Sequence, residues 1–139
     1  MPQELANKDL MLSVTAAWRD GNLEPLFAAI HPDIVWKATA PREFFRFGGM
    51  YMGILGVREY IALHASRYLL TRFRPKTLTA KGDQVWGLFE IEALYLPTGK
   101  PVASECAICW TVKDGRITEH QAVFDTASVL MQQGVLTAA

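Results

Sequence analysis

The segment 83–126 constrains the fold more than any other, because it contains three long runs of strand-forming residues. The runs are GDQVWGLFEIEALYL, PVASECAICWTV and RITEHQAVFDT, and the turns PTGK and KDG separate them. The runs are rich in β-branched and aromatic residues and both turns contain glycine, which is typical of antiparallel hairpins. We therefore predict three strands in two consecutive hairpins.

The first hairpin has one apolar face. A tight turn over residues 96–101 would place Phe89 opposite Ile108, Ile91 opposite Cys106, and Ala93 opposite Ser104. Cross-strand partners share a face, so we expect an inner face of Val85, Gly87, Phe89, Ile91, Ala93, Tyr95, Val102, Ser104, Cys106, Ile108, Trp110 and Val112. The outer face carries Glu90, Glu92, Glu105, Thr111 and Lys113. The same register puts Glu92 opposite Glu105, a pair that needs water or a cation from elsewhere, for example from a second subunit.

The second hairpin allows two registers. A two-residue Asp114-Gly115 turn would turn Ile117, Glu119, Gln121 and Val123 inward, whereas a three-residue loop with Gly115 in the left-handed region would turn Thr118, His120, Ala122 and Phe124 inward. We favour the second, because burying Glu119 and Gln121 without partners would cost several kcal/mol.

The remaining segments are predicted to form helices, two further strands and a loop. Apolar spacing predicts helices over 5–19, 23–30 and 57–70, strands over 33–38 and 72–80, and an aromatic loop over 39–53. A closing helix over 126–133 is capped by Asp125 or Thr126 and stopped by Gly134. This order predicts one α+β domain over 1–139, in which a curved mixed or antiparallel sheet wraps as a cone around the N-terminal helices and leaves a cavity.

Composition narrows the function classes. Fourteen basic and fourteen acidic residues leave no net charge, and no basic run occurs, so we expect no nucleic-acid partner. No apolar run is long enough to span a membrane, and the first residues do not form a signal peptide. We expect a cytoplasmic protein without a membrane partner.

Four stretches resemble a known family. AAWRDGNLEPLFAAIHPDIVW, LYLPTGKPV, WTVKDGRITEHQAVFDT and the closing MQQG look like the SnoaL-like polyketide cyclases of the nuclear transport factor 2-like superfamily, which also contains ketosteroid isomerases and limonene epoxide hydrolases. The resemblance implies the cystatin-like cone. It implies little about the reaction, because this fold serves enzymes and binding proteins alike.

The catalytic positions of these relatives fall on apolar residues here. In the cyclases an acid-base aspartate follows a Glu-His pair on the last strand, and Glu119-His120 is followed instead by Ala122 at that position, which also matches an epoxide hydrolase carboxylate. The other epoxide hydrolase positions match Phe89 and Ile91, and the isomerase positions match Ala38, Val14 and Ile108. A shift of one residue in this match would restore Asp125, which we keep as a catalytic candidate.

The remaining chemistry centres on His120. On the inner face near Trp110, its imidazole could act as a general base; the alternative is a buried histidine with a purely structural role. The candidate ligand-binding residues are Trp36, Tyr51, His64, Phe89, Cys106, Ile108, Trp110 and Phe124, with Ser104 as a further lining residue.

Two apparent sites fail on geometry. Cys106 and Cys109 are three apart on a strand and point to opposite faces, so their sulfur atoms cannot meet. His31 precedes a proline outside the cone, so we expect no three-histidine metal site, and we expect no cofactor.

Two hypotheses remain: a proton-transfer enzyme acting at His120 on an apolar carbonyl compound, and a binding module for a small apolar molecule. Either could form a homodimer through the outer sheet face.

Overall fold

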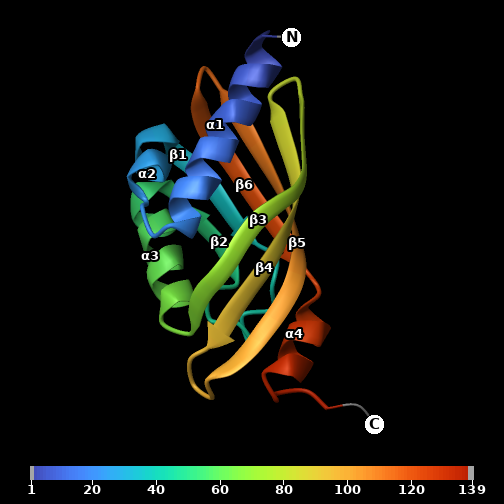
Figure 1. The fold of residues 1–139 in the computed structure, drawn as a ribbon. Coiled ribbons are helices and arrows are strands. Elements are labelled where there is room, and N and C mark those ends of the chain that lie inside the picture. Colours follow the sequence, from blue (N-terminus) through green and yellow to red (C-terminus); the bar gives the residue numbers. More distant parts are fainter. Residues whose placement is uncertain (1, 138–139) are drawn as a thin grey trace.

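The computed structural model describes residues 2–137 and shows the predicted α+β architecture, a curved sheet with helices on its concave side (Figure 1). The elements in chain order are α1 (Pro2–Arg19), α2 (Glu24–Ala29), β1 (Ile30–Ala38), β2 (Gly49–Met52), α3 (Gly53–Ala65), β3 (Tyr68–Lys81), β4 (Gln84–Tyr95), β5 (Lys100–Lys113), β6 (Arg116–Phe124) and α4 (Thr126–Gln132). None of the helices in the described part of the chain has the length and apolar character needed to span a bilayer.

The six strands form one sheet in the order β2-β1-β6-β5-β4-β3. All neighbouring strands are antiparallel except β1 and β6, which are parallel. The long β3, β4 and β5 strands bend around α1, which packs on β3 and β4 (Figure 1). At the other end of the sheet, α4 packs against β5, and the Asp125 carboxylate caps it by accepting a hydrogen bond from the Ser128 amide at 3.0 Å. The Asp125 cap was therefore predicted correctly.

The predicted faces of β4 and β5 are confirmed, but their register was wrong by two residues. Phe89 pairs with Cys106 and Ile91 with Ser104, because the turn closes at Tyr95 and Lys100. In this turn the Gly99 amide donates to the Tyr95 carbonyl at 2.8 Å. A shift of two residues leaves every side chain on its predicted face, since side chains alternate with period two.

The new register also changes the like-charge pair. Glu105 lies opposite Glu90, not Glu92. Its neutralising cations come from β3 of the same chain and not from a second subunit: Arg74 Nε lies 2.6 Å from Glu90 Oε2, and Lys76 Nζ lies 2.7 Å from Glu105 Oε2.

The second hairpin has the short turn of one predicted register and, further along β6, the side-chain directions of the other. Asp114 and Gly115 form a two-residue turn with φ values of 51° and 74°, so the predicted three-residue loop was wrong. A bulge then follows, since Val112 pairs with Ile117 but Thr111 pairs with Glu119. The extra residue, Thr118, reverses the alternation, and therefore both Ile117 and His120 are buried.

Three boundaries also differ from the prediction. The expected loop over 39–53 contains the short edge strand β2, in which Tyr51 pairs with Trp36. Helix α3 begins earlier and ends at Ala65, so that Tyr68 already belongs to β3. Strand β1 begins at Ile30 and includes Pro32, a residue that sequence reasoning places outside strands; the irregular register between Ile30 and Val35 accommodates it.

Candidate functional site

A hollow forms on the concave face of the sheet because small side chains are aligned across its strands. Ala38 on β1 pairs with Ala122 on β6, and Ala122 pairs with Ile108 on β5. Nearer the β4–β5 turn, Ser104 pairs with Ile91, and Val102 pairs with Ala93. Alanine and serine at these positions cannot fill the space under the helices. The cavity is therefore a consequence of side-chain size at adjacent register positions.

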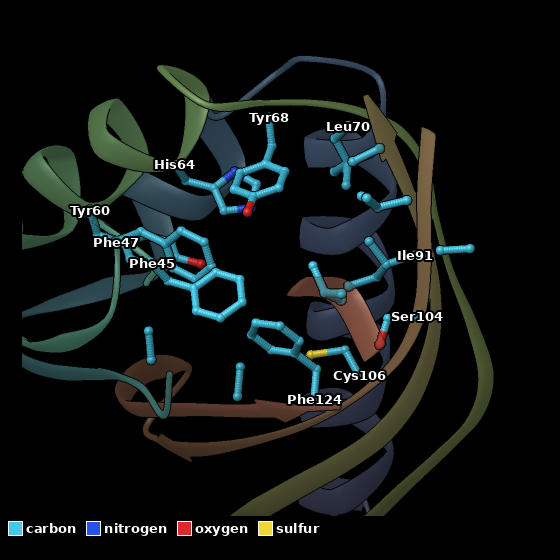
Figure 2. A pocket seen from close by; sticks show the side chains of 16 residues that line it. Phe45, Phe47, Tyr60, His64, Tyr68, Leu70, Ile91, Ser104, Cys106 and Phe124 are labelled. Carbon is cyan, nitrogen blue, oxygen red and sulfur yellow. The ribbon is translucent and has the colours of Figure 1, made fainter. Parts of the chain in front are cut away.

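The cavity has two adjoining chambers. The α4 chamber, of about 100 Å³, lies between β5, α4 and the segment that contains Phe45 and Phe47 (Figure 2). The α1 chamber, of about 310 Å³, extends toward the C-terminal end of α1 and includes Trp18, Trp110 and His120. Seven residues line both chambers: Tyr60, His64, Tyr68, Leu70, Ile91, Cys106 and Ala122.

The lining is almost free of charge. No Asp, Glu, Lys or Arg lines the α4 chamber within residues 2–137, and Arg19 is the one charged lining residue of the α1 chamber in that range. The Arg19 Nε lies 3.2 Å from Asp20 Oδ1 at the surface. Such a cavity offers apolar contacts and a few neutral polar groups, which suits an uncharged ligand better than an ionic one.

Helix α3 supplies the polar groups at the junction of the chambers. Tyr60 and His64 are four residues apart and therefore lie on the same helix face. The His64 ring lies 4.9 Å from the Phe47 ring and 5.4 Å from the Tyr68 ring, measured between centroids. Burial among these rings lowers the pKa of His64 to about 4 and raises the pKa of Tyr60 above its ordinary value. Both side chains are consequently neutral at pH 7.

Tyr68 and Cys106 are also neutral. The Tyr68 hydroxyl donates a hydrogen bond of 2.7 Å to Gln133 Oε1, and burial raises the pKa of this tyrosine to about 12. Burial likewise raises the pKa of the Cys106 thiol to about 12, so it is not a thiolate nucleophile at neutral pH. Cys109 is on the opposite face of β5, and both cysteines are free, as predicted.

His120 lies in a row of side chains across the sheet. It pairs with Trp36 on β1 and with Trp110 on β5. Its ring stacks on Trp36 with 3.6 Å between centroids and 9° between planes. Burial lowers the pKa of His120 to about 3. Both buried nitrogen atoms at this stack, His120 Nδ1 and Trp36 Nε1, lack a hydrogen-bond partner among the described residues.

The structure brings together most of the predicted ligand-binding residues. His64, Cys106 and Phe124 line the α4 chamber, and His64, Cys106, Ile108 and Trp110 line the α1 chamber. Ser104, the further lining residue, lies in the α4 chamber and donates a hydrogen bond of 2.9 Å to the Glu105 carbonyl.

Four predicted site residues lie elsewhere. Trp36 and Phe89 are fully buried beneath the lining, and neither contributes to a chamber wall. The Tyr51 hydroxyl donates to the Phe47 carbonyl at 2.9 Å, and thereby holds the preceding loop instead of facing a chamber. Asp125 is exposed as the cap of α4, so its carboxylate does not reach the cavity.

The residues that the candidate list missed are Tyr60, Tyr68, Phe45 and Phe47. Tyr60, His64 and Tyr68 are four residues apart, and this spacing predicts that their side chains lie on the same side of a helix. Tyr68 does lie beside the other two, but it belongs to β3 and not to the helix. Phe45 and Phe47 come from an irregular segment, and no periodicity predicts the direction of their side chains. Across residues 2–137, no group of three or more His, Cys, Asp or Glu side chains could hold a metal ion.

Solved structures share this fold. The crystal structure of TerC co-crystallised with polyporic acid has 24% sequence identity and a TM-score of 0.82, covering 91% of this chain and 97% of that one. An NTF2-like protein of unknown function from Burkholderia pseudomallei has 19% identity and a TM-score of 0.84, covering 91% and 96%. A protein with a ketosteroid isomerase-like fold from Catenulispora acidiphila, in complex with trimethylamine, has 19% identity and a TM-score of 0.77, covering 91% and 93%.

These identities are too low to transfer an activity, and they show the fold alone. Comparison with curated proteins finds no match. The family model of the SnoaL-like domain matches residues 13–120. This match spans most of the chain, from the middle of α1 to His120 on β6, and includes nearly every strand of the cone. The protein belongs to the SnoaL-like domain family.

Proposed function

We propose that the protein binds an uncharged, ring-bearing small molecule in the cavity between its helices and sheet. The observation that carries the proposal is the lining, which combines aromatic rings with neutral polar groups and has one charged residue, Arg19, within the described chain. A charged ligand would lose its hydration without gaining a counter-charge there. Flat rings would contact the Phe47, Tyr68 and Phe124 side chains.

The structure supports binding better than proton transfer at His120. A base with a pKa of about 3 accepts a proton from a carbon acid far less readily than a base whose pKa lies near the working pH. The Nδ1 atom is also sealed from solvent beside Trp36. Without a carboxylate in the described lining, no second group raises the basicity of this imidazole.

The binding proposal is tested with a neutral and an ionised form of one ring system. Methyl 2-naphthoate and 2-naphthoate are titrated calorimetrically into the protein at pH 7, and we expect the ester to bind at least about tenfold more tightly. Ala122→Leu should weaken ester binding, because this alanine lines both chambers. Ala107→Leu is the matched control, since Ala107 pairs with Leu88 on the outer face of the same sheet. Equal affinity for the two forms, or equal effects of the two variants, would contradict the proposal.

Proton transfer is tested separately. 2-Tetralone is incubated with the protein in D₂O, and deuterium entry at its α carbons is followed by NMR. We expect no acceleration over buffer. An acceleration that disappears in His120→Phe would instead establish this histidine as a base.

A further inference from the structure

His64 occupies the junction of the two chambers. It lies in the last turn of α3 and is close to three aromatic rings. Phe47 and Tyr68 come from two other parts of the chain, and Tyr60 lies one turn earlier on the same helix, at 6.1 Å between ring centroids. Figure 2 shows His64 beside Tyr68, across the hollow from Ile91 and Ser104. A molecule that extends from one chamber into the other must pass this imidazole.

The hydrogen-bonding atoms of His64 are not used by the protein. No residue from 2 to 137 forms a hydrogen bond with its imidazole, although the side chain is only half-buried and lines both chambers. The neighbouring Tyr68 hydroxyl is already committed to Gln133. His120 differs, because its unpaired Nδ1 is buried beside Trp36 and its side chain lines the α1 chamber but not the α4 chamber. Of the two cavity histidines, His64 is therefore the one that reaches both chambers with an imidazole that no described residue pairs.

A neutral imidazole carries one donor and one acceptor. In an apolar cavity an unpaired polar atom is unfavourable, so a ligand group that pairs with it gains more than it would in water. Burial keeps the pKa of His64 near 4, and the ring therefore offers both functions, without a positive charge, at pH 7. Hydroxyl and carbonyl groups match such a partner.

We propose that His64 is the specificity-determining residue of the cavity, and that it selects ring compounds carrying a hydroxyl or carbonyl group at the junction of the two chambers. This inference rests on the proposed binding function and identifies the polar feature of the ligand. The rings of the ligand occupy the two chambers, and its oxygen atom pairs with the imidazole.

The test compares 2-naphthol with naphthalene as probes. Their affinities are measured at pH 7 for the wild-type protein and for His64→Phe, His64→Gln and His31→Phe. We expect His64→Phe to reduce the preference for 2-naphthol over naphthalene by about tenfold while naphthalene still binds. His64→Gln should keep part of the preference, because an amide retains a donor and an acceptor. His31→Phe is the matched control, because it makes the same change at a histidine that lines neither chamber, and it should leave the preference within about twofold of wild type.

The outcomes separate this inference from the proposed function. If both probes bind and the preference is unchanged in His64→Phe and His64→Gln, His64 is not the specificity-determining residue, whereas the binding function stands. If neither probe binds, both are overturned. If His31→Phe removes the preference as completely as His64→Phe, the loss does not come from the imidazole in the cavity and the assignment to His64 is wrong.

Discussion

At the scale of single residues, the imidazoles of buried His120 and half-buried His64 make stability depend on pH. In the folded protein the pKa values of His64 and His120 are about 4 and about 3, whereas an unfolded histidine has a pKa of about 6.5. Between these values the unfolded chain binds more protons than the folded one, so the free energy of unfolding rises with pH and falls as the solution is acidified. His120 should contribute a loss of roughly 2 kcal/mol between pH 7 and pH 5, and half-buried His64 should contribute less, because solvent can stabilise its charged form.

The pH prediction is checked by urea unfolding at pH 7, 6 and 5. His120→Phe should lose about 2 kcal/mol less over this range than the wild-type protein. Its stability at pH 7 should be unchanged or higher, because the substitution keeps a ring against Trp36 and removes the unpaired Nδ1. Above pH 5 most carboxylates stay ionised, including Glu90, whose pKa the Arg74 guanidinium lowers further. An identical pH dependence in His120→Phe would show that the native imidazole is not held neutral.

At the scale of elements, α4 completes the edge that β6 leaves open. The ladder between β5 and β6 ends where Cys106 pairs with Phe124, so Ala103 has no strand neighbour on that side. The Gln132 side chain takes this place: its Oε1 accepts from the Ala103 amide at 2.7 Å, and its Nε2 donates to the Ala103 carbonyl at 2.8 Å. Together with the Tyr68–Gln133 hydrogen bond, this contact fixes α4 over the α4 chamber.

Gln132→Ala should therefore destabilise the protein by about 1–3 kcal/mol, because two backbone groups lose their partners. Urea unfolding measures the loss, and hydrogen exchange should show faster exchange of the Ala103 amide. Met131→Ala is the control on the same helix, since Met131 is 48% exposed and should change stability by less than about 0.5 kcal/mol. Equal effects of the two variants would mean that the glutamine contact does not hold the helix.

At the scale of the whole molecule, the outer face of the sheet carries an apolar patch. Trp86 pairs with Cys109, Leu88 with Ala107, and Ala107 with Val123. Trp86 is 53% exposed and Val123 is 43% exposed. The ion pairs of Arg74 with Glu90 and of Lys76 with Glu105 lie beside this patch on the same face. An exposed apolar patch bordered by charges is typical of an interface, so we keep the prediction of a homodimer.

The dimer prediction is tested by sedimentation velocity over a range of protein concentrations. The wild-type chain should sediment as a dimer, and Trp86→Lys should shift it to the monomer. Leu55→Lys is the control, because Leu55 is 81% exposed on α3, away from the sheet face. A monomer at all concentrations, or a dimer that Trp86→Lys leaves intact, would contradict the prediction.

Much of the fold could be predicted because local patterns determine it. The alternation of β4 and β5 specified their inner faces even though the register was wrong by two residues, since an even shift preserves facing. The inward direction of His120 and Ala122 was also predicted correctly, but by an incorrect turn. The actual cause is the bulge at Thr118, and a single sequence gives no signal that distinguishes a bulge from a longer loop.

The candidate site was predicted less completely, because it depends on contacts between distant segments. The sequence determined which side chains of the first hairpin face the core, and its family resemblance predicted the cone. Tertiary structure decided the rest. No hairpin connects β1 and β6, so no turn in the sequence predicts their parallel pairing. This pairing stacks Trp36 on His120 and aligns Ala38 with Ala122. The cavity, and the place of His64 between its chambers, exist because strands far apart in the sequence put small residues side by side beneath α3.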